Sequence, residues 1–363
     1  MKTLRSYILR EHAPPFFVTM GGLTAVLLIG NIIKFAELVI SKGVGVFDVL
    51  RLLVYLIPYM LSFTIPMACL IAIVLAFARL SSDYELIALR ASGISPIRLV
   101  WPLLTVGLVA SVILLVVNDQ LVPHSHLAFR QQLKAIGIKR PTAYMEAGTF
   151  IKEFPPYVIF VYHVEGSRLD NVRIYEPQPN GPTRTIIAER GEFERMSDKR
   201  SVQLKLHDGT VDEFDPERPG SFYKVNFVTY SMVLRADQEG SQSLSRKVKE
   251  LTFKQLVVEA RRLEAQGIDV LPIDLELHRK IASSFAPLIF IAFGLTLGLR
   301  LHHHERLISF VWVLAIFIGY YLTSVGMNAL ASKGWLPAWL AMWIPNLAGG
   351  LISAALLGRT VRN

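Results

Sequence analysis

The chain has 363 residues, of which 52% are hydrophobic, and a formal net charge of +9. This apolar content is higher than is usual for a soluble enzyme of this size. The basic residues are spread along the chain and form no single block, so nucleic acid is not an expected partner. The single cysteine, Cys69, lies inside an apolar run, which excludes a disulfide framework and a cysteine-based zinc site.

Six segments without Asp, Glu, Lys or Arg are long enough to cross a bilayer, which requires about 20 residues. They lie between His12 and Lys34, Arg51 and Arg79, Arg98 and Asp119, Lys280 and Arg300, Arg306 and Lys333, and Lys333 and Arg359. Loops on one side of these spans carry most of the Lys and Arg residues, so we expect that side and both termini to be cytoplasmic. The polar stretch between the third and fourth spans then lies in the periplasm of a Gram-negative cell.

The first span is predicted to begin after Pro14 and Pro15 and to be retained, because no A-x-A cleavage site follows it. Lys34 and Glu37 lie three residues apart near its outer end, and therefore on one face of a helix. A lysine at this depth is costly unless it reaches the interface or an anion. We expect the pair to be either an interfacial anchor or a contact for an anionic lipid headgroup.

The segment 79–98, RLSSDYELIALRASGISPIR, is charged and amphipathic and lies between two long apolar runs. It predicts a helix over about 80–92 at the membrane surface. The residues expected to face inward are Leu80, Leu86, Ile87 and Leu89, and those expected to face water or a partner are Asp83, Glu85 and Arg90. Gly93 and Pro96 are expected to end this helix, since glycine suits a helix cap and proline cannot continue the helix.

The sequence contains no G-x-x-x-x-G-K-[ST] motif, so the chain does not bind ATP through a P-loop of its own. Acidic residues are nearly absent from the predicted spans, which argues against a proton relay. A transporter of this composition would take its energy from a partner on the cytoplasmic side. The segment 79–98 is the predicted cytoplasmic loop that is long enough to present a helix to such a partner.

The order of these patterns predicts a membrane α-helical protein with an inserted all-β domain. The first three spans fall within residues 1–121, a helical connection within 122–140, the β-domain within 141–240, a second helical connection within 241–279 and the last three spans within 280–363. In the first connection, Arg130 and Lys134 face either anionic headgroups or solvent. In the second, Thr252 and Gln255 form the capping-box start of a helix.

The β-domain is predicted from six segments between residues 142 and 235 in which apolar and polar residues alternate. Asn180-Gly181, Asp208-Gly209 and Pro219-Gly220 are expected to form turns. The pattern is typical of a sandwich or a jellyroll-like domain.

Three consecutive histidines, His302–His304, follow the fourth span. Successive helical residues point about 100° apart, so these side chains do not converge on a metal ion from one helix. We interpret them as a polar cytoplasmic flank, and we expect neither a metal site nor a cofactor.

The sequence RLSSDYELIALRASGIS resembles the cytoplasmic coupling helix of the LptF/LptG permeases of lipopolysaccharide export, also called the YjgP/YjgQ family. The order of three spans, a periplasmic β-domain and three further spans is also similar to that family. LRSYILRE near the start, ELHRKIA before the fourth span and MWIPNLAGG in the last span favour the LptF branch, whereas IIKF in the first span is more like LptG.

The resemblance implies a permease subunit of an ABC transporter. Its partners would be a paralogous LptF/LptG subunit, two copies of an LptB-like ATPase and an LptC-like protein. Lipopolysaccharide would enter through lateral gates at the first and fifth spans and pass to periplasmic β-jellyroll domains. The residues that match the family's coupling motif are Glu85, Arg90, Ser92 and Gly93, and Lys34 matches the first-span lysine expected near the lipid phosphates. By their position we add Asp83 and Leu86 to the expected ATPase-coupling residues, and Glu37, Arg130 and Lys134 to the expected lipid-binding residues.

Two other functions stay open on the sequence. The first is a non-transporting membrane scaffold or sensor whose periplasmic β-domain binds a partner. The second is a membrane enzyme that modifies lipids, although no His, Asp and Ser constellation clusters at one membrane face. Co-purification with a P-loop ATPase would separate the transporter from the scaffold.

Overall fold

The structure is a computed structural model with two compact units. It describes residues 2–40, 42–92, 97–139, 148–151, 154, 156–165, 168–178, 181–195, 201–214, 222–235, 248–300 and 306–362. The helical unit comprises Met1–Asn31, Tyr55–Leu127 and Arg246–Asn363, and the second unit comprises Ile32–Val54 and Ala128–Ser245. The predicted histidine flank, His302–His304, lies outside the described residues.

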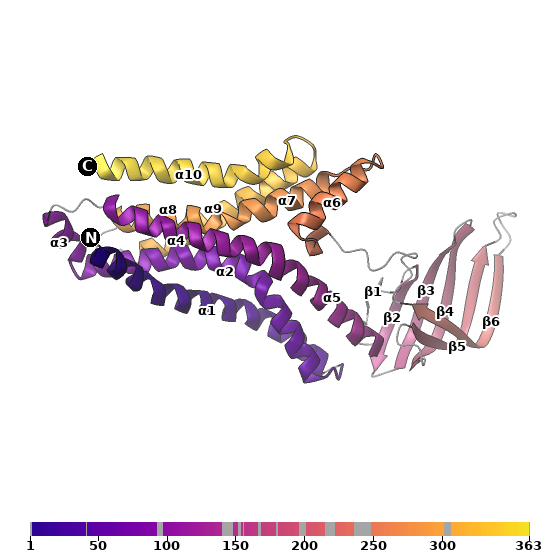
Figure 1. Ribbon diagram of the computed structural model, residues 1–363. Helices are drawn as coiled ribbons and strands as arrows, with labels where there is room; N and C mark the ends of the chain where they lie inside the picture. The colour runs from indigo at the N-terminus through magenta and orange to yellow at the C-terminus, as the bar shows by residue number, and fades with distance from the viewer. Residues whose placement is uncertain are drawn as a thin grey trace. The chain divides into compact units, whose positions relative to one another are not determined.

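The helices follow the predicted order (Figure 1). They are α1 Lys2–Ile40, α2 Val46–Ser82, α3 Glu85–Ala91, α4 Ile97–Val116, the π-helical turn η1 Val117–Leu121, α5 Val122–Lys139, the 3-10 turn η3 Val248–Glu250, α6 Phe253–Glu264, α7 Leu271–Ser284, α8 Ala286–Arg300, α9 Arg306–Ser332 and α10 Ala338–Arg362. Among the described residues, six helical stretches are long and apolar enough to cross a membrane, which confirms the expected number of spans.

The ends of three spans differ from the sequence prediction. Helix α1 runs through Pro14 and Pro15 without a break, as is tolerated in membrane helices where other groups satisfy the freed carbonyls. The third span continues through η1 into α5, so it does not stop near Asn118. The fourth span begins at Leu271, ahead of the predicted start after Lys280, and is divided at Phe285 into α7 and α8.

Glycines on α8 and α10 allow the helices of the bundle to approach closely. A Cβ atom on Gly298 would lie 2.6 Å from the Phe77 side chain of α2, and one on Gly349 would lie 2.7 Å from Cγ2 of Ile289. Gly294 meets Ile73 of α2 in the same way, at 3.0 Å. Close backbone approach through small residues spaced four apart is a common way to pack membrane helices.

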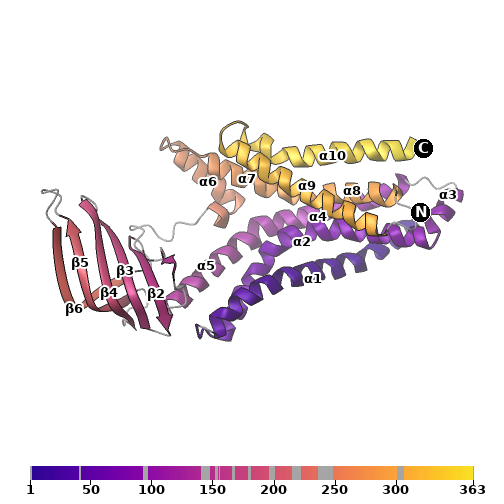
Figure 2. The same cartoon turned by 180° about the vertical axis from the view of Figure 1, so that it is seen from behind.

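The inserted domain is one six-stranded antiparallel sheet in which each strand pairs with its neighbour in the sequence (Figure 2). Its strands are β1 Phe150–Ile151, β2 Val158–Glu165, β3 Arg168–Gln178, β4 Gly181–Arg195, β5 Ser201–Phe214 and β6 Phe222–Arg235. This confirms an all-β insertion with the six predicted strands. In the described strands the order is that of a meander, without the crossover connections that define a jelly roll.

One predicted turn of the β-domain is wrong. Asp208 and Gly209 lie in the middle of β5 and not between two strands. Gly209 pairs with Ala188 of β4 and with Phe227 of β6, whereas the register of both ladders skips Asp208. Asp208 has a φ of 53°, which an aspartate tolerates better than most residues. A Cβ atom on Gly209 would lie 2.3 Å from the carbonyl oxygen of Ile187 and 2.5 Å from the Phe227 ring. The pair therefore makes a local irregularity where neighbouring groups approach the strand. The other predicted turn residues, Asn180, Pro219 and Gly220, lie outside the described residues.

Alternate residues of the strands build a core on one face of this sheet. The fully buried members include Ile159, Val161, Ile174, Ile186 and Leu204. Their neighbours along each strand, such as Tyr162 and Ile187, are exposed. This alternation is the period of two on which the prediction of the domain rested.

Candidate functional site

The first candidate site is the coupling segment, residues 79–92, between the second and third spans. Helix α2 extends through its first part to Ser82, and the seven-residue helix α3 follows at Glu85. Tyr84 has a φ of 59°, a value at which a right-handed helix does not continue. The segment is therefore the end of a long helix joined to a short one by a turn, whereas the sequence predicted one helix over 80–92.

Two side-chain contacts tie the start of α1 to the coupling segment. The hydroxyl of Tyr7 donates to the Glu85 carboxylate, at 2.9 Å from Oε1 and 2.8 Å from Oε2. Arg79 bonds Glu11 and also lies 3.6 Å from Asp83. Tyr7 and Glu11 are one helical turn apart and so share a face of α1. No sequence pattern predicts either contact, because the two partners of each are far apart in the chain.

The remaining predicted coupling residues have different surroundings. Leu80 is buried and Leu89 packs against the helical core, as expected. Ile87 is 55% exposed, so the prediction that it faces inward is wrong. Ser92 is exposed and donates its hydroxyl to the carbonyl oxygen of Ala88 at 2.8 Å. Leu86 and Arg90 belong to α3, but their side chains, like the whole of Gly93, lie outside the described residues.

An apolar pocket of about 390 Å³ lies beside the coupling segment. Its lining comes from α2, from α9 and from Asp83 in the turn after α2, and it is mainly aliphatic and aromatic, with Arg79, Ser82 and Asp83 as its polar members. The end of α2 therefore lines an apolar pocket. The same region also makes the two side-chain contacts with α1.

The predicted lipid-binding residues lie in the second unit. Lys34 and Glu37 are exposed on α1, and in the described part of the chain no ion pair joins them. Arg130 and Lys134 are half-buried on α5, and each has a polar or electrostatic partner. The outer end of α1 packs beside α5, since the rings of Phe35 and Phe129 are 6.2 Å apart. The structure thus brings the outer end of α1 and helix α5 together.

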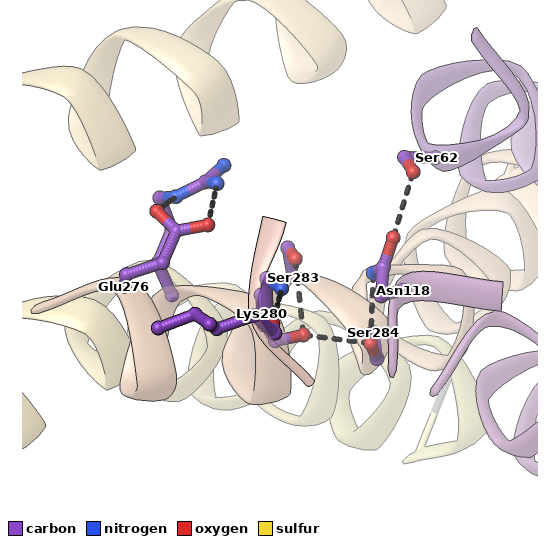
Figure 3. Close-up of polar contacts among 8 residues, drawn as sticks. Ser62, Asn118, Glu276, Lys280, Ser283 and Ser284 are labelled. Carbon is purple, nitrogen blue, oxygen red and sulfur yellow. Dashed lines mark hydrogen bonds and ion pairs between the residues drawn. The ribbon is translucent and has the colours of Figure 1, made fainter. Parts of the chain in front are cut away.

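The second candidate site is a polar cavity of about 260 Å³ within the helical unit. It is lined from α2, η1, α5, η3, α7, α9 and α10, at the end of the unit where the chain leaves for the inserted sheet and returns from it. Figure 3 shows its central polar residues, including Ser62, Asn118, Glu276 and Lys280. We call this site the polar cavity.

Helix α7 contributes Glu276, Arg279 and Lys280 to the polar cavity, and η3 contributes Lys249. Glu276 accepts two hydrogen bonds from Arg279, 3.0 Å from Nε and 2.6 Å from Nη2. Lys280 is only 4% exposed, and its Nζ donates to the carbonyl oxygen of Leu251 at 2.6 Å. These residues follow a spacing of three and four, so they lie on one face of α7. The sequence pattern places ELHRK at the entry to the fourth span but does not identify its charges as a site.

A chain of hydrogen bonds joins three helical segments beside these charges (Figure 3). Ser62 of α2 donates to Oδ1 of Asn118 at 2.7 Å, and Nδ2 of Asn118 donates to Ser284 of α7 at 2.9 Å. Asn118 belongs to η1, where the helix makes a π-helical turn. Such turns are often found at functional sites in other proteins. No sequence pattern marked this turn in advance.

Comparison with known proteins is consistent with this architecture. The family model described as "Lipopolysaccharide export system permease LptF/LptG" matches residues 6–359. The chain is also 23% identical over 216 residues to the uncharacterized protein RP871 of Rickettsia prowazekii (strain Madrid E), and the match covers 59% of each protein. The family match includes all six spans, the inserted sheet and both candidate sites. The chain therefore belongs to the family of lipopolysaccharide export system permeases LptF/LptG.

Proposed function

We propose that this chain is the membrane-spanning permease subunit of an ABC transporter in the Gram-negative inner membrane. It would extract lipopolysaccharide from that membrane and pass it to a periplasmic bridge toward the outer membrane. A separate LptB-like ATPase, in two copies, would supply the energy. A paralogous LptF/LptG subunit would complete the membrane channel, and an LptC-like protein would receive the lipid. In this arrangement both termini are cytoplasmic and the sheet is periplasmic.

The coupling segment is the observation that best supports an ATPase partner. Tyr84, in the turn before α3, is 65% exposed, and Ile87, on α3, is 55% exposed. Both are large side chains with apolar surface. Exposed aromatic and aliphatic groups beside charged ones are typical of a protein-binding surface. The segment is also held to α1 through Glu85 and Arg79. A partner that moves α3 would therefore also act on the first span.

The lateral surfaces of the helical bundle support a paired permease. In the most apolar stretches of the first and fifth spans, 0% and 11% of residues are buried, against 67% in the second span. Val18 and Val26 on α1 and Leu322 on α9 are among the exposed side chains. These two helices therefore offer apolar surface to lipid or to a second subunit. We propose them as the lateral gate, with Lys34, Glu37, Arg130 and Lys134 as contacts for the lipid headgroup.

Charge reversal at Glu85 tests the ATPase assignment. We expect Glu85→Arg to abolish co-purification with a P-loop ATPase and to stop lipopolysaccharide export, because it places a cation where the partner meets a carboxylate. Both are measured by affinity purification of the tagged chain and by the appearance of new lipopolysaccharide at the cell surface.

Two control variants separate the proposed contact from other effects. Tyr7→Phe removes the hydrogen bond to Glu85 but keeps the carboxylate, so it should retain the ATPase. Glu189→Arg reverses an exposed charge on β4 and should leave both measurements unchanged. If Glu85→Arg retains the ATPase and export, the coupling assignment is wrong. A chain that never co-purifies with an ATPase would favour the scaffold or sensor function.

A further inference from the structure

We propose that the face of the sheet opposite its core carries a binding site for uncharged sugar rings, centred on Tyr162 of β2. The site is separate from the residues proposed to contact the lipid headgroup on α1 and α5. It rests on the proposed function only for the source of the sugars, which would be the saccharide part of lipopolysaccharide. The side chains of β1, β2 and β3 supply the chemistry.

Four aromatic rings from three neighbouring strands gather on this face. Phe150 of β1 lies opposite Phe160 of β2, and their ring centroids are 4.9 Å apart. Phe160 is also 4.9 Å from Tyr162, and Phe150 is 6.4 Å from Tyr175 of β3. The residue between Phe160 and Tyr162 is Val161, which is buried in the core on the other face. We call the four rings the aromatic patch.

The aromatic patch is open to solvent. Phe150 is 61% exposed and Tyr162 is 47% exposed, while Phe160 and Tyr175 are half-buried. Large apolar groups that remain exposed together usually mark a place where a ligand or partner binds. Aromatic rings suit this purpose because they offer a large rigid contact area and lose little side-chain entropy.

Polar groups with unused hydrogen-bonding capacity border the aromatic patch. The guanidinium of Arg173 lies over the Tyr162 ring, 5.3 Å from its centroid. In the part of the chain that the structure describes, no side-chain hydrogen bond or ion pair is recorded for Arg173, Asp170, Asn171 or the Tyr162 hydroxyl. Arginine only donates and a carboxylate only accepts, whereas an amide and a phenol do both. A ligand here meets donors and acceptors next to aromatic rings.

An irregularity of the sheet places two of these polar groups outside the core. The register of β2 with β3 skips Tyr162 and Asn171, which lie opposite each other, and Asn171 has a φ of 52°. Leu169 and Val172 are both buried although they are three residues apart, which strict alternation along a strand does not allow. Between them, Asn171 is exposed and Asp170 is half-buried. Irregularities of this kind redirect side chains, often next to functional sites.

The combination of groups favours a sugar over an acyl chain or a peptide. A sugar ring has C–H faces that stack on an aromatic ring and hydroxyl groups that donate and accept hydrogen bonds. An acyl chain would remove water from Arg173 and Asp170 without replacing its hydrogen bonds, which is costly. A peptide that adds as a strand needs an unpaired edge, whereas β2 is already paired with both β1 and β3.

Charges of both signs surround the aromatic patch, so the favoured sugar is uncharged. The nearest rows of β3, β4 and β5 carry two cations, Arg173 and Arg190, and three carboxylates, Asp170, Glu189 and Asp208. Arg190 bonds Asp208 at 3.1 Å. The carboxylates are at least as numerous as the cations, so an anionic group would meet no excess of positive charge.

Saturation-transfer NMR on the full-length chain tests the proposal. The chain in phosphatidylcholine nanodiscs is mixed with dephosphorylated core oligosaccharide that has been freed of lipid A, or with maltoheptaose. Aromatic protons of the protein are saturated, and we expect transfer to ring C–H protons of the core oligosaccharide. Titration gives the affinity. Phe150→Ala and Tyr162→Ala should each weaken binding by about three- to tenfold, as expected for loss of one aromatic contact.

The matched control is Tyr223→Ala, which removes a tyrosine that is 55% exposed on β6, away from the aromatic patch, and should preserve binding. Tyr162→Phe keeps the ring and should retain most of the affinity. Arg173→Gln alters an exposed side chain outside the core, so it should weaken binding without unfolding the sheet. Melting temperatures identify variants that fail to fold. Wild-type affinity in folded Tyr162→Ala and Arg173→Gln chains would overturn the proposal.

The two sugars also identify the source of the ligand. Binding of the core oligosaccharide alone, dependent on Tyr162, supports the saccharide of lipopolysaccharide. Equal Tyr162-dependent binding of maltoheptaose supports a site for uncharged sugars in general. If neither sugar binds in a manner that depends on Tyr162, the aromatic patch is not a sugar site. Retained ATPase co-purification and export in that case would leave the proposed function standing.

Discussion

At the scale of single residues, Gly298 is one of the tightest positions of the helical unit. The place of its missing side chain is occupied by Phe77 of α2, whose Cβ and Cγ atoms lie 2.6 Å from where a Cβ would be. Phe77 is itself fully buried and cannot move aside without disturbing its neighbours. The close packing of α2 against α8 therefore requires glycine at position 298, because the methyl group of an alanine would overlap Phe77.

We expect Gly298→Ala to destabilise the bundle by about 1–3 kcal/mol, the usual cost of overpacking a core. Gly326→Ala on α9 is the matched control, since nothing lies within 4 Å of the position that its added methyl group would take. It should be neutral or slightly stabilising, because alanine favours helix over glycine. Melting temperatures in detergent by size-exclusion chromatography would measure both. Equal melting temperatures for the two variants would contradict this packing.

Single residues also show where a local sequence pattern predicts the wrong conformation. The sequence pattern predicts Ile87 on the buried face of one surface helix, but the turn at Tyr84 separates α3 from α2, and Ile87 is exposed. Asp208-Gly209 has the composition of a hairpin turn and yet lies inside β5. In both places contacts with other parts of the chain decide the conformation, and local propensity does not.

At the scale of elements, helix α6 is fastened to the membrane bundle by its first turn. Oδ1 of Asp119, in the π-helical turn η1, accepts the backbone N–H of Phe253 at 2.6 Å. Thr252 and Gln255 complete a capping box, as the sequence predicted. The start of α6 therefore has acceptors both from its own sequence and from the third span.

Removal of the Asp119 carboxylate should loosen α6. Since loss of a helix cap costs about 1 kcal/mol, we expect Asp119→Ala to speed amide hydrogen exchange in the first turn of α6 by about fivefold. Asp119→Asn keeps a side-chain oxygen and should have a smaller effect. Exchange followed by mass spectrometry on the full chain would resolve this peptide. Exchange at the wild-type rate in Asp119→Ala would show that the contact does not hold the helix.

At the scale of the whole molecule, the proposed function requires opposite sides of the membrane for the coupling segment and the sheet. Cys69 is the single cysteine of the chain and is only 3% exposed, so it gives a low background for labelling. Ser92 in the coupling segment and Glu189 on β4 are both exposed. These two positions can therefore report on which side each part lies.

We expect a membrane-impermeant maleimide to label Glu189→Cys in cells with a permeable outer membrane, and to label Ser92→Cys only after the inner membrane is opened. The Lys and Arg excess in the loops on the side of Ser92 is the physical reason. The wild-type chain, with Cys69 alone, is the control. The reverse pattern would place the sheet in the cytoplasm and remove the basis for ATPase coupling through α3.

The sequence by itself determined the six spans, the six strands and the capping box of α6. Each of these is local: span length, the alternation of strand residues and a cap signal can be seen in a few to some twenty neighbouring residues. The same locality identified the segment 79–92, because two apolar runs bound it. Which residues of this segment are buried depends on contacts with distant parts of the chain, and the prediction for Ile87 was therefore wrong.

The tertiary structure alone decided which polar side chains meet. Tyr7 meets Glu85 from 78 residues away, and Asn118 joins Ser284 across 166 residues. The polar cavity combines side chains of seven helical segments, so no single stretch of sequence announces it. Side-chain geometry over such separations depends on how the helices pack. The hydropathy pattern of a helix shows which of its faces is buried. It does not show which side chain of another helix packs against that face.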